Sequence, residues 1–132
     1  MVVYVDTSAI MSILYEGDVN HAKAIETWVN MAREETELVC NNYVFVETFS
    51  LLQRRYGMDK ARALQERIAP LLDIDWLNPE QHETATSNVL TANRRSLSLV
   101  DCSSFETMRR LRIETVFTFD EHFKEQGFIV IP

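Results

Sequence analysis

The N-terminal stretch Val2-Val3-Tyr4-Val5-Asp6-Thr7-Ser8-Ala9 sets the architecture of this chain. Its first four residues are apolar or aromatic, and three of them are valines, which is typical of a strand buried on both faces. The run ends on the carboxylate of Asp6 and two hydroxyls. In an open parallel sheet, ligands bind at the carboxyl ends of the strands, so such a strand would present Asp6 to a substrate or a metal ion. The same pattern also caps helices, and for this stretch alone a cap is the commoner explanation.

Four more short apolar runs follow, and helical patterns separate them. We expect strands at 38–40, 74–77, 115–119 and 128–131. We expect helices at 7–16, 21–35, 43–56, 60–72, 79–94, 99–112 and 120–125. Strands that alternate with helices predict a parallel, doubly wound sheet of about five strands, with helices on both faces and right-handed crossovers. With no repeat and no linker, residues 1–132 form a single α/β domain in this interpretation.

Two of the helical segments have distinctive sequence features. In segment 43–56, the apolar spacing predicts an inward face made of Tyr43, Val46, Phe49, Leu52 and Tyr56. In segment 60–72, Pro70 should kink or loosen the last turn, because proline has no amide hydrogen to donate.

The composition is that of an ordinary globular protein, long enough to bury one core without staples. No run approaches the roughly 20 apolar residues that span a bilayer, and no signal peptide is evident, so we expect a cytoplasmic protein and no membrane contact. Cys40 and Cys102 lack CxxC spacing and should be reduced core residues. The histidines His21, His82 and His122 are scattered, and we expect them on the surface.

The charge balance is acidic, with 13 basic and 20 acidic residues and a net charge of −7. This excess argues against a general nucleic-acid coat protein, which would be basic. It does not exclude a nuclease, because an acidic metal site contributes much negative charge. The basic residues include the pairs Arg54-Arg55 and Arg94-Arg95. These pairs are candidates for RNA contact, although solvated helix surfaces explain them equally well.

Four acids occupy equivalent places along the predicted fold. Asp6 and Asp120 directly follow strands. Glu47 follows the second strand by one turn of helix, and Asp101 falls in the first turn of its helix. All four should therefore lie toward the same edge of the sheet. Two unit charges ~4 Å apart repel by about 4 kcal/mol at an effective dielectric of 20, so such a cluster needs a cation or a shared proton. Oxygen ligands without paired cysteines suit Mg²⁺ or Mn²⁺.

Helix capping and dipole effects could account for each of Asp6, Asp101 and Asp120 taken singly. Glu47 is harder to explain in this way, because its neighbours Val46 and Phe49 are apolar and an unpaired charge there is unfavourable. Taken together, four acids in the same relative position favour a common site.

These residues carry a resemblance. The pieces that carry it are Val5-Asp6-Thr7-Ser8-Ala9, Glu47-Thr48-Phe49-Ser50-Leu51-Leu52, Leu97-Ser98-Leu99-Val100-Asp101 and Thr118-Phe119-Asp120-Glu121-His122-Phe123. In this order and spacing the chain resembles PIN domains, and most closely the VapC-type toxins. The resemblance extends over nearly the whole chain.

The resemblance implies a metal-dependent endoribonuclease. Asp6, Glu47, Asp101 and Asp120 would be the acidic quartet that binds Mg²⁺ or Mn²⁺, and Ser8 and Thr118 would support it. The family further implies a homodimer and a cognate antitoxin whose C-terminal segment enters the acidic groove. Some relatives carry a further acid one turn after the third, where this chain has Ser103-Ser104-Phe105.

Two other functional classes remain compatible with the sequence. A PIN-like module with structural acids would bind RNA or a protein partner without catalysis. A receiver-like phosphoacceptor also clusters acids, but no lysine stands near the ends of the last strands, and Lys124 lies too far into the final helix.

Overall fold

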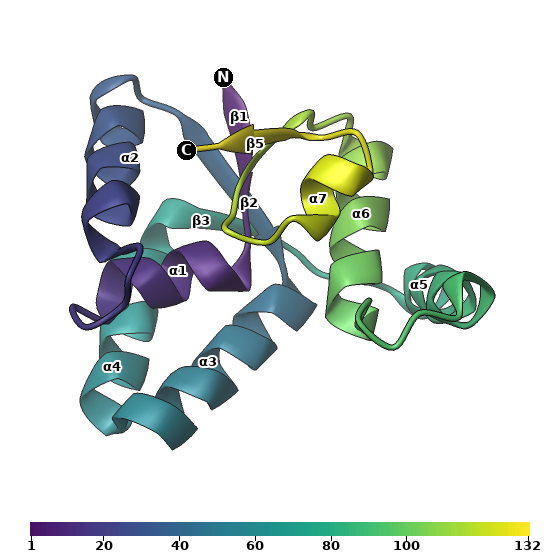
Figure 1. The fold of residues 1–132 in the computed structure, drawn as a ribbon, viewed down its shortest axis with the longest axis horizontal. Coiled ribbons are helices and arrows are strands. Elements are labelled where there is room, and N and C mark those ends of the chain that lie inside the picture. The colour runs from purple at the N-terminus through teal and green to yellow at the C-terminus, as the bar shows by residue number, and fades with distance from the viewer.

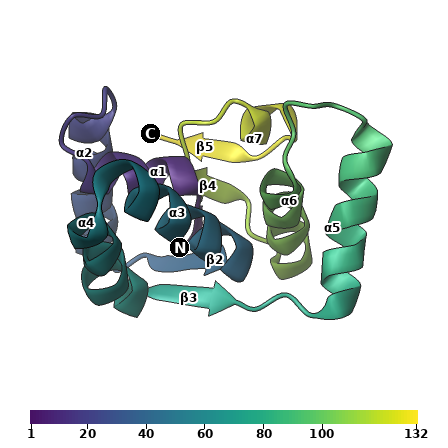
Figure 2. The same ribbon diagram turned by 90° about the horizontal axis from the view of Figure 1, so that it is seen from below.

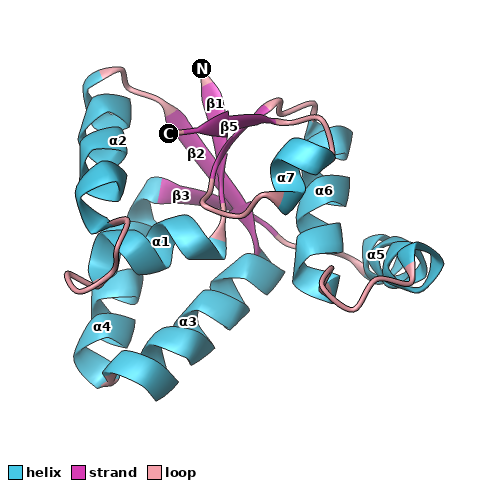
Figure 3. Cartoon of the chain, viewed as in Figure 1, coloured by secondary structure: helices cyan, strands magenta, loops and turns pink.

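The computed structural model describes residues 1–132, and its strands form one parallel sheet in the order β3-β2-β1-β4-β5 (Figure 3). The strands are β1 (Val2–Val5), β2 (Glu37–Asn41), β3 (Leu72–Asp75), β4 (Thr115–Phe117) and β5 (Ile129–Ile131). Every pairing is parallel. The predicted α/β class and the number of strands are therefore confirmed.

Strand β1 lies at the centre of the sheet. It pairs with β2 on one side and β4 on the other, and Tyr4 is in register with both Val39 and Val116. Val3, Tyr4 and Val5 are fully buried, as expected of a strand covered on both faces. Because β1 is central, the residue that follows it, Asp6, lies at the middle of the carboxyl edge.

The helices cover both faces of this sheet. They are α1 (Thr7–Leu14), α2 (His21–Arg33), α3 (Asn42–Tyr56), α4 (Met58–Ala63), α5 (Pro79–Ala92), α6 (Leu99–Leu111) and α7 (His122–Glu125). Helices α1, α2 and α4 lie on one side and α5, α6 and α7 on the other (Figure 1). Helix α5 is outermost, beyond α6 (Figure 2). None of these helices has both the length and the apolar character needed to cross a bilayer.

The third strand begins earlier than the sequence predicted. We expected it at 74–77, whereas β3 is Leu72–Asp75, and the side chain of Trp76 is 70% exposed. After α4 the chain passes through a π-helical turn (Leu64–Ile68) and a 3₁₀ turn (Ala69–Leu71). The loosened end expected at Pro70 is present, and the helix stops in time for Leu72 to enter the sheet.

The inward face of α3 agrees with the prediction in part, because Leu52 is fully buried and Phe49 and Tyr56 pack against the core. Its buried residues are Val44, Thr48 and Leu52, whereas Val46 is 59% exposed. The hydroxyl of Thr48 lies 2.7 Å from the carbonyl oxygen of Val44 and 3.0 Å from the hydroxyl of Thr7. A threonine whose hydroxyl is satisfied in this way packs inward, so counting apolar residues alone missed Thr48 and wrongly placed Val46 on the inward face.

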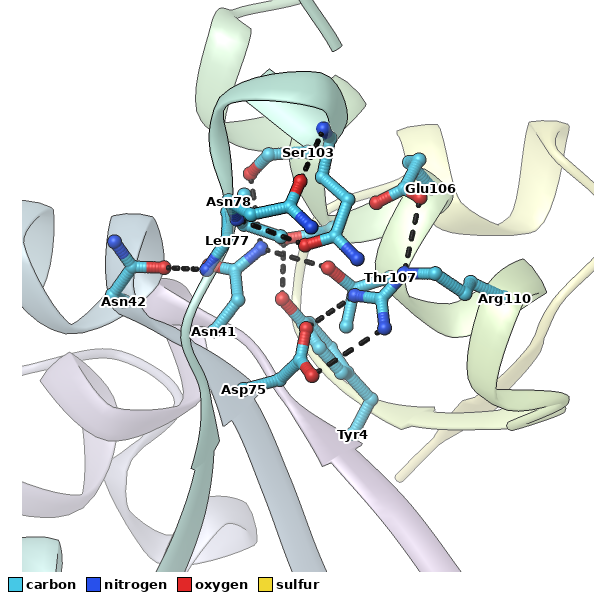
Figure 4. A network of polar contacts seen from close by, with 12 residues as sticks. Tyr4, Asn41, Asn42, Asp75, Leu77, Asn78, Ser103, Glu106, Thr107 and Arg110 are labelled. Atoms are coloured by element: carbon cyan, nitrogen blue, oxygen red, sulfur yellow. Dashed lines mark hydrogen bonds and ion pairs between the residues drawn. The ribbon is translucent and has the colours of Figure 1, made fainter. Parts of the chain in front are cut away.

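A buried amide joins the carboxyl end of β2 to α6. The side chain of Asn41 is fully buried; its Oδ1 accepts a hydrogen bond from the amide of Val44 at 2.9 Å, which caps α3. Its Nδ2 donates to the hydroxyls of Ser103 and Thr107, both at 3.1 Å (Figure 4). One side chain therefore fixes the start of α3 against the middle of α6.

Further polar contacts reinforce the same junction. The hydroxyl of Tyr4 on β1 donates to Ser104 on α6 at 2.9 Å. At the outer edge, Arg110 on α6 pairs with Asp75 at the end of β3 and with Glu106 (Figure 4). Helix α6 is thus held to β1, β2 and β3 by polar contacts as well as by packing.

Replacing Asn41 by alanine should destabilise the protein by about 3 kcal/mol. The substitution removes the cap of α3, worth about 1 kcal/mol, and leaves buried hydroxyls on Ser103 and Thr107 with fewer partners. Urea unfolding followed by circular dichroism measures the change. As a control, Asn30→Ala on the exposed surface of α2 should change the free energy of unfolding by less than about 0.5 kcal/mol. Equal effects of the two substitutions would contradict the role given to Asn41.

Candidate functional site

The four acids come from four segments and line one cavity. Asp6 follows β1, Glu47 lies in the second turn of α3, Asp101 lies in the first turn of α6, and Asp120 lies between β4 and α7. The cavity that all four line has a volume of about 410 Å³. The structure therefore brings together the acids that the sequence placed at one edge of the sheet.

Asp6 is the most deeply buried of these acids, with only 5% of its surface exposed. Its Oδ2 accepts hydrogen bonds from Ser8 Oγ at 2.9 Å and from Thr118 Oγ1 at 2.8 Å. Asp6 stands at the N-cap position of α1 but makes no side-chain cap hydrogen bond. The capping explanation that the sequence left open therefore does not apply to Asp6.

The two hydroxyls extend the contact from Asp6 to the backbone near Asp120. Ser8 Oγ accepts a hydrogen bond from the amide of Phe119 at 2.9 Å, and Thr118 Oγ1 accepts one from the amide of Asp120 at 3.0 Å. Strand β4 ends at Phe117, two residues before the predicted end, so Thr118 and Phe119 are free to make this turn. Ser8 and Thr118 thus connect the first acid to the loop that carries the last.

Asp101 and Asp120 do make local helix-end contacts. Asp101 Oδ2 accepts from the amide of Ser98, and the amide of Asp101 donates to Ser98 Oγ, both at 3.0 Å, which forms a capping box. Asp120 Oδ1 accepts from the amide of His122 at 2.9 Å. Helix α7 begins at His122, not at 120 as predicted, and Asp120 precedes it. For these two acids, the helix-end contacts that the sequence allowed are therefore present.

Burial makes the charges in this cavity unfavourable. The pKa of Asp6 is raised to about 6, mainly by burial and also by the charge of Asp101, although the hydrogen bonds from Thr118 and Ser8 act against this rise. Burial likewise raises the pKa of Glu47 and of Asp101, with contributions from Asp101 and Asp120, respectively. A bound cation would remove this penalty.

One functional candidate was missed by the sequence analysis. We expected His122 on the surface, but its side chain is only 19% exposed, and its Nδ1 lies 3.1 Å from Asp120 Oδ1 and 3.9 Å from Asp101 Oδ2. His122 follows Asp120 by two residues and begins α7, and this places its imidazole beside Asp101 and Asp120. The signal that could have found it was this proximity to an acid at a strand end.

The predicted basic residues separate into different environments. Arg55 lines the cavity and makes no ion pair. Arg94 pairs with Glu125 at 3.1 Å, away from the acids. Arg54 and Arg95 are exposed and do not line the cavity. Only Arg55 is placed where it could meet a ligand of the acidic cavity.

The cavity has further walls that the sequence analysis did not identify. Asp18 lines it, but its Oδ1 is occupied by the amide of Asn20 at 2.7 Å and the hydroxyl of Ser12 at 3.1 Å. Tyr56 also lines it and stacks on Tyr15, with ring centroids 4.0 Å apart. Asn20, Phe119 and Asp120 are shared with a neighbouring cavity of about 570 Å³, which lies beside Lys124.

The donor set fits a divalent cation. Asp101, Asp120 and His122 each offer one ligand atom, and these atoms all lie within 4.8 Å of one another. His122 Nδ1 is buried and makes no hydrogen bond, so one donor in the group lacks a partner. Carboxylate oxygens dominate the wall, and neither cysteine contributes to it: both are buried and unpaired, as expected.

Comparison with known proteins gives a consistent family assignment. A family model described as the PIN domain matches residues 3–129. The 23S rRNA-specific endonuclease VapC20 of Mycobacterium tuberculosis (strain H37Rv) is 29% identical over 130 residues, which cover 98% of this chain and 97% of that protein. The crystal structure of the M. tuberculosis VapC20, described as a sarcin-ricin loop cleaving toxin, superposes with a TM-score of 0.88 over 100% of both chains.

More distant structures share the fold. FitAcB from Neisseria gonorrhoeae is 16% identical, with a TM-score of 0.71 over 100% of this chain and 97% of the other. VapBC2 from Rickettsia felis, bound to a promoter DNA fragment, is 10% identical, with a TM-score of 0.72 over 98% and 97%. At these identities the likeness concerns the fold alone.

Asp6→Asn should stabilise the cation-free protein at high pH. Because folding raises the pKa of Asp6 from 3.8 to about 6, the folded state binds this proton more tightly than the unfolded chain. The stability that Asp6 contributes is therefore fully present below about pH 4 and is lost as the pH rises through 6. Asparagine avoids that loss, so the variant should gain roughly 1–3 kcal/mol at pH 8.

Thermal unfolding in chelator at pH 4, 6 and 8 measures this difference. The gain should vanish toward pH 4, and the control Asp59→Asn, at a fully exposed side chain, should show no such pH dependence. A variant that is less stable than the parent by the same amount at all three pH values would show that the hydrogen bonds of Asp6, not its charge, dominate.

Proposed function

The chain belongs to the PIN-domain family, and on this premise we propose that it is a metal-dependent endoribonuclease that hydrolyses RNA phosphodiester bonds as the toxin of a toxin–antitoxin pair. One observation carries the proposal: four carboxylates from four segments line a single cavity at the carboxyl edge of the sheet. Burial raises the pKa values of Asp6, Glu47 and Asp101, so their negative charges are unfavourable in the cavity. Such shifts are typical of functional sites, and a bound cation would stabilise these charges.

In this proposal the acids hold the ion and orient the substrate. Asp6, Asp101 and Asp120 would bind Mg²⁺ or Mn²⁺, and Glu47 would complete the site or serve a second ion. When bound, such an ion activates a water molecule and stabilises the attacking and leaving oxygens of an in-line displacement. Ser8 and Thr118 direct Asp6 Oδ2 through their hydrogen bonds and so leave Oδ1 for the ion.

RNA is the proposed substrate. VapC20, which matches nearly the full length of this chain, is described as a 23S rRNA-specific endonuclease. Arg55 is the unpaired cation on the cavity wall, so it would bind a phosphate beside the one that is cleaved. Tyr56, the next residue, lines the same cavity and offers an aromatic ring near the bases.

The proposed protein partners are a cognate antitoxin and a second copy of this chain. The cavity wall carries Asp6, Asp18, Glu47, Asp101 and Asp120 and a single arginine, so a basic C-terminal segment of an antitoxin would complement it. The net charge of −7 favours the same partner at longer range. Homodimer formation is the second assembly that membership of the VapC-like group implies.

Cleavage should require both the cation and Asp6. With labelled RNA and Mn²⁺ or Mg²⁺, Asp6→Asn should reduce the rate by more than about 100-fold, because it removes a charged ligand. Chelator should abolish cleavage by the parent, and Asp59→Asn should cleave at the parental rate. Equal rates for parent and Asp6→Asn would contradict the metal assignment. RNA binding without cleavage under all conditions would favour the catalytically silent binding module.

Arg55→Ala should weaken RNA binding while Arg54→Ala, on the adjacent exposed position, should not. In the Asp6→Asn background, binding can be measured by fluorescence anisotropy without cleavage. Loss of one phosphate contact should weaken binding several-fold and reduce the slope of log K against log salt concentration by about 0.7. Identical slopes for the two arginine variants would remove Arg55 from the RNA path.

A further inference from the structure

His122 places a ring nitrogen among the carboxylates. The residue opens α7, and its Nδ1 lies 3.1 Å from Asp120 Oδ1 and 3.9 Å from Asp101 Oδ2. The two carboxyl groups and this nitrogen offer three potential ligand atoms that all lie within 4.8 Å of one another. The other histidines lie elsewhere: His21 Nδ1 contacts the carbonyl of Ser12 at 2.8 Å, and His82 contacts the hydroxyl of Tyr43.

The nitrogen of His122 lacks a hydrogen bond despite its neighbours. Nδ1 is buried and unpartnered, and although its distance to Asp120 is that of an ion pair, Asp120 Oδ1 takes its hydrogen bond from the backbone amide of His122. His122 Nδ1 therefore faces two carboxylates without a hydrogen-bond partner of its own. A cation bound between these three groups would contact all of them and supply the missing partner.

The spacing of the three atoms matches a shared ion. An octahedral ion with bonds of roughly 2.1–2.2 Å places adjacent ligand atoms about 3 Å apart and opposite ones about 4.3 Å apart. The distances of 3.1 and 3.9 Å from Nδ1 lie within this range.

We propose that His122 is a nitrogen ligand of the divalent ion, alongside Asp101 and Asp120. The inference rests on the proposed function, since it concerns the same ion, but it goes beyond a site made of carboxylates alone. Imidazole suits first-row transition ions, whereas Mg²⁺ prefers oxygen ligands. The chain should therefore bind Mn²⁺ more tightly than Mg²⁺, and His122 should account for much of that preference.

Electron spin-echo envelope modulation on the Mn²⁺-loaded protein tests this directly. The parent should show ¹⁴N modulation from a coordinated imidazole, and protein labelled with ¹⁵N-histidine should show the corresponding ¹⁵N pattern. His122→Gln should lose the signal, and the control His21→Gln should keep it. The labelled parent needs no substitution, so the test stands even if the variant folds poorly.

Isothermal titration supplies the second readout. His122→Gln should weaken Mn²⁺ binding by about 10-fold or more and Mg²⁺ binding by less, so the ratio of the two affinities falls. Bound Mn²⁺ without nitrogen coupling, or an unchanged ratio in the variant, would overturn the inference and leave the nuclease proposal intact; a protonated His122 that only pairs with the carboxylates gives this result. A parent that binds neither ion would overturn both.

Discussion

The buried amide of Asn41 is the constraint on which the geometry of the site depends. Glu47 lies on α3, which begins at Asn42, and Asp101 lies on α6, which begins at Leu99. The hydrogen bonds of the sheet do not by themselves fix how these two helices sit against each other. Asn41 caps α3 and, with its other end, bonds two hydroxyls of α6. Because leaving a buried amide without its hydrogen-bond partners is unfavourable, these three contacts restrict the relative position of the two helices. The acids that they carry are held accordingly.

Folding brings negatively charged side chains together at one edge of the sheet, which is electrostatically unfavourable. Folding carries Asp6, Glu47 and Asp101 into a partly buried wall that raises their pKa values, so the fold tolerates unfavourable charge at one edge and offsets it with a fully buried core around β1. Such local instability is typical of functional sites. The hydroxyls of Ser8 and Thr118 moderate the penalty at Asp6 and fix the orientation of its carboxylate.

Much of this structure could be predicted from the sequence, because its strands are short apolar runs and its acids follow strand ends. The failures have physical causes. Strand β3 begins two residues earlier than predicted, because the helix before it ends in π and 3₁₀ turns around Pro70. Helix α3 buries a threonine, because the hydroxyl of Thr48 is satisfied by a carbonyl of the same helix. His122 was missed because the short turn after Asp120, which redirects its ring, has no periodicity to read.

The hydrogen bond from Thr118 to Asp6 spans 112 positions of the chain. During synthesis, Asp6 is made long before the segment that orients it, and β1 lacks its β4 neighbour until residues 115–117 have been added. A nascent chain that ends before Thr118 therefore has neither this strand pairing nor the hydroxyl that holds Asp6, and it cannot assemble the cavity. The strand order therefore determines when the cavity can form, because the first strand, β1, pairs with β4, which is made late.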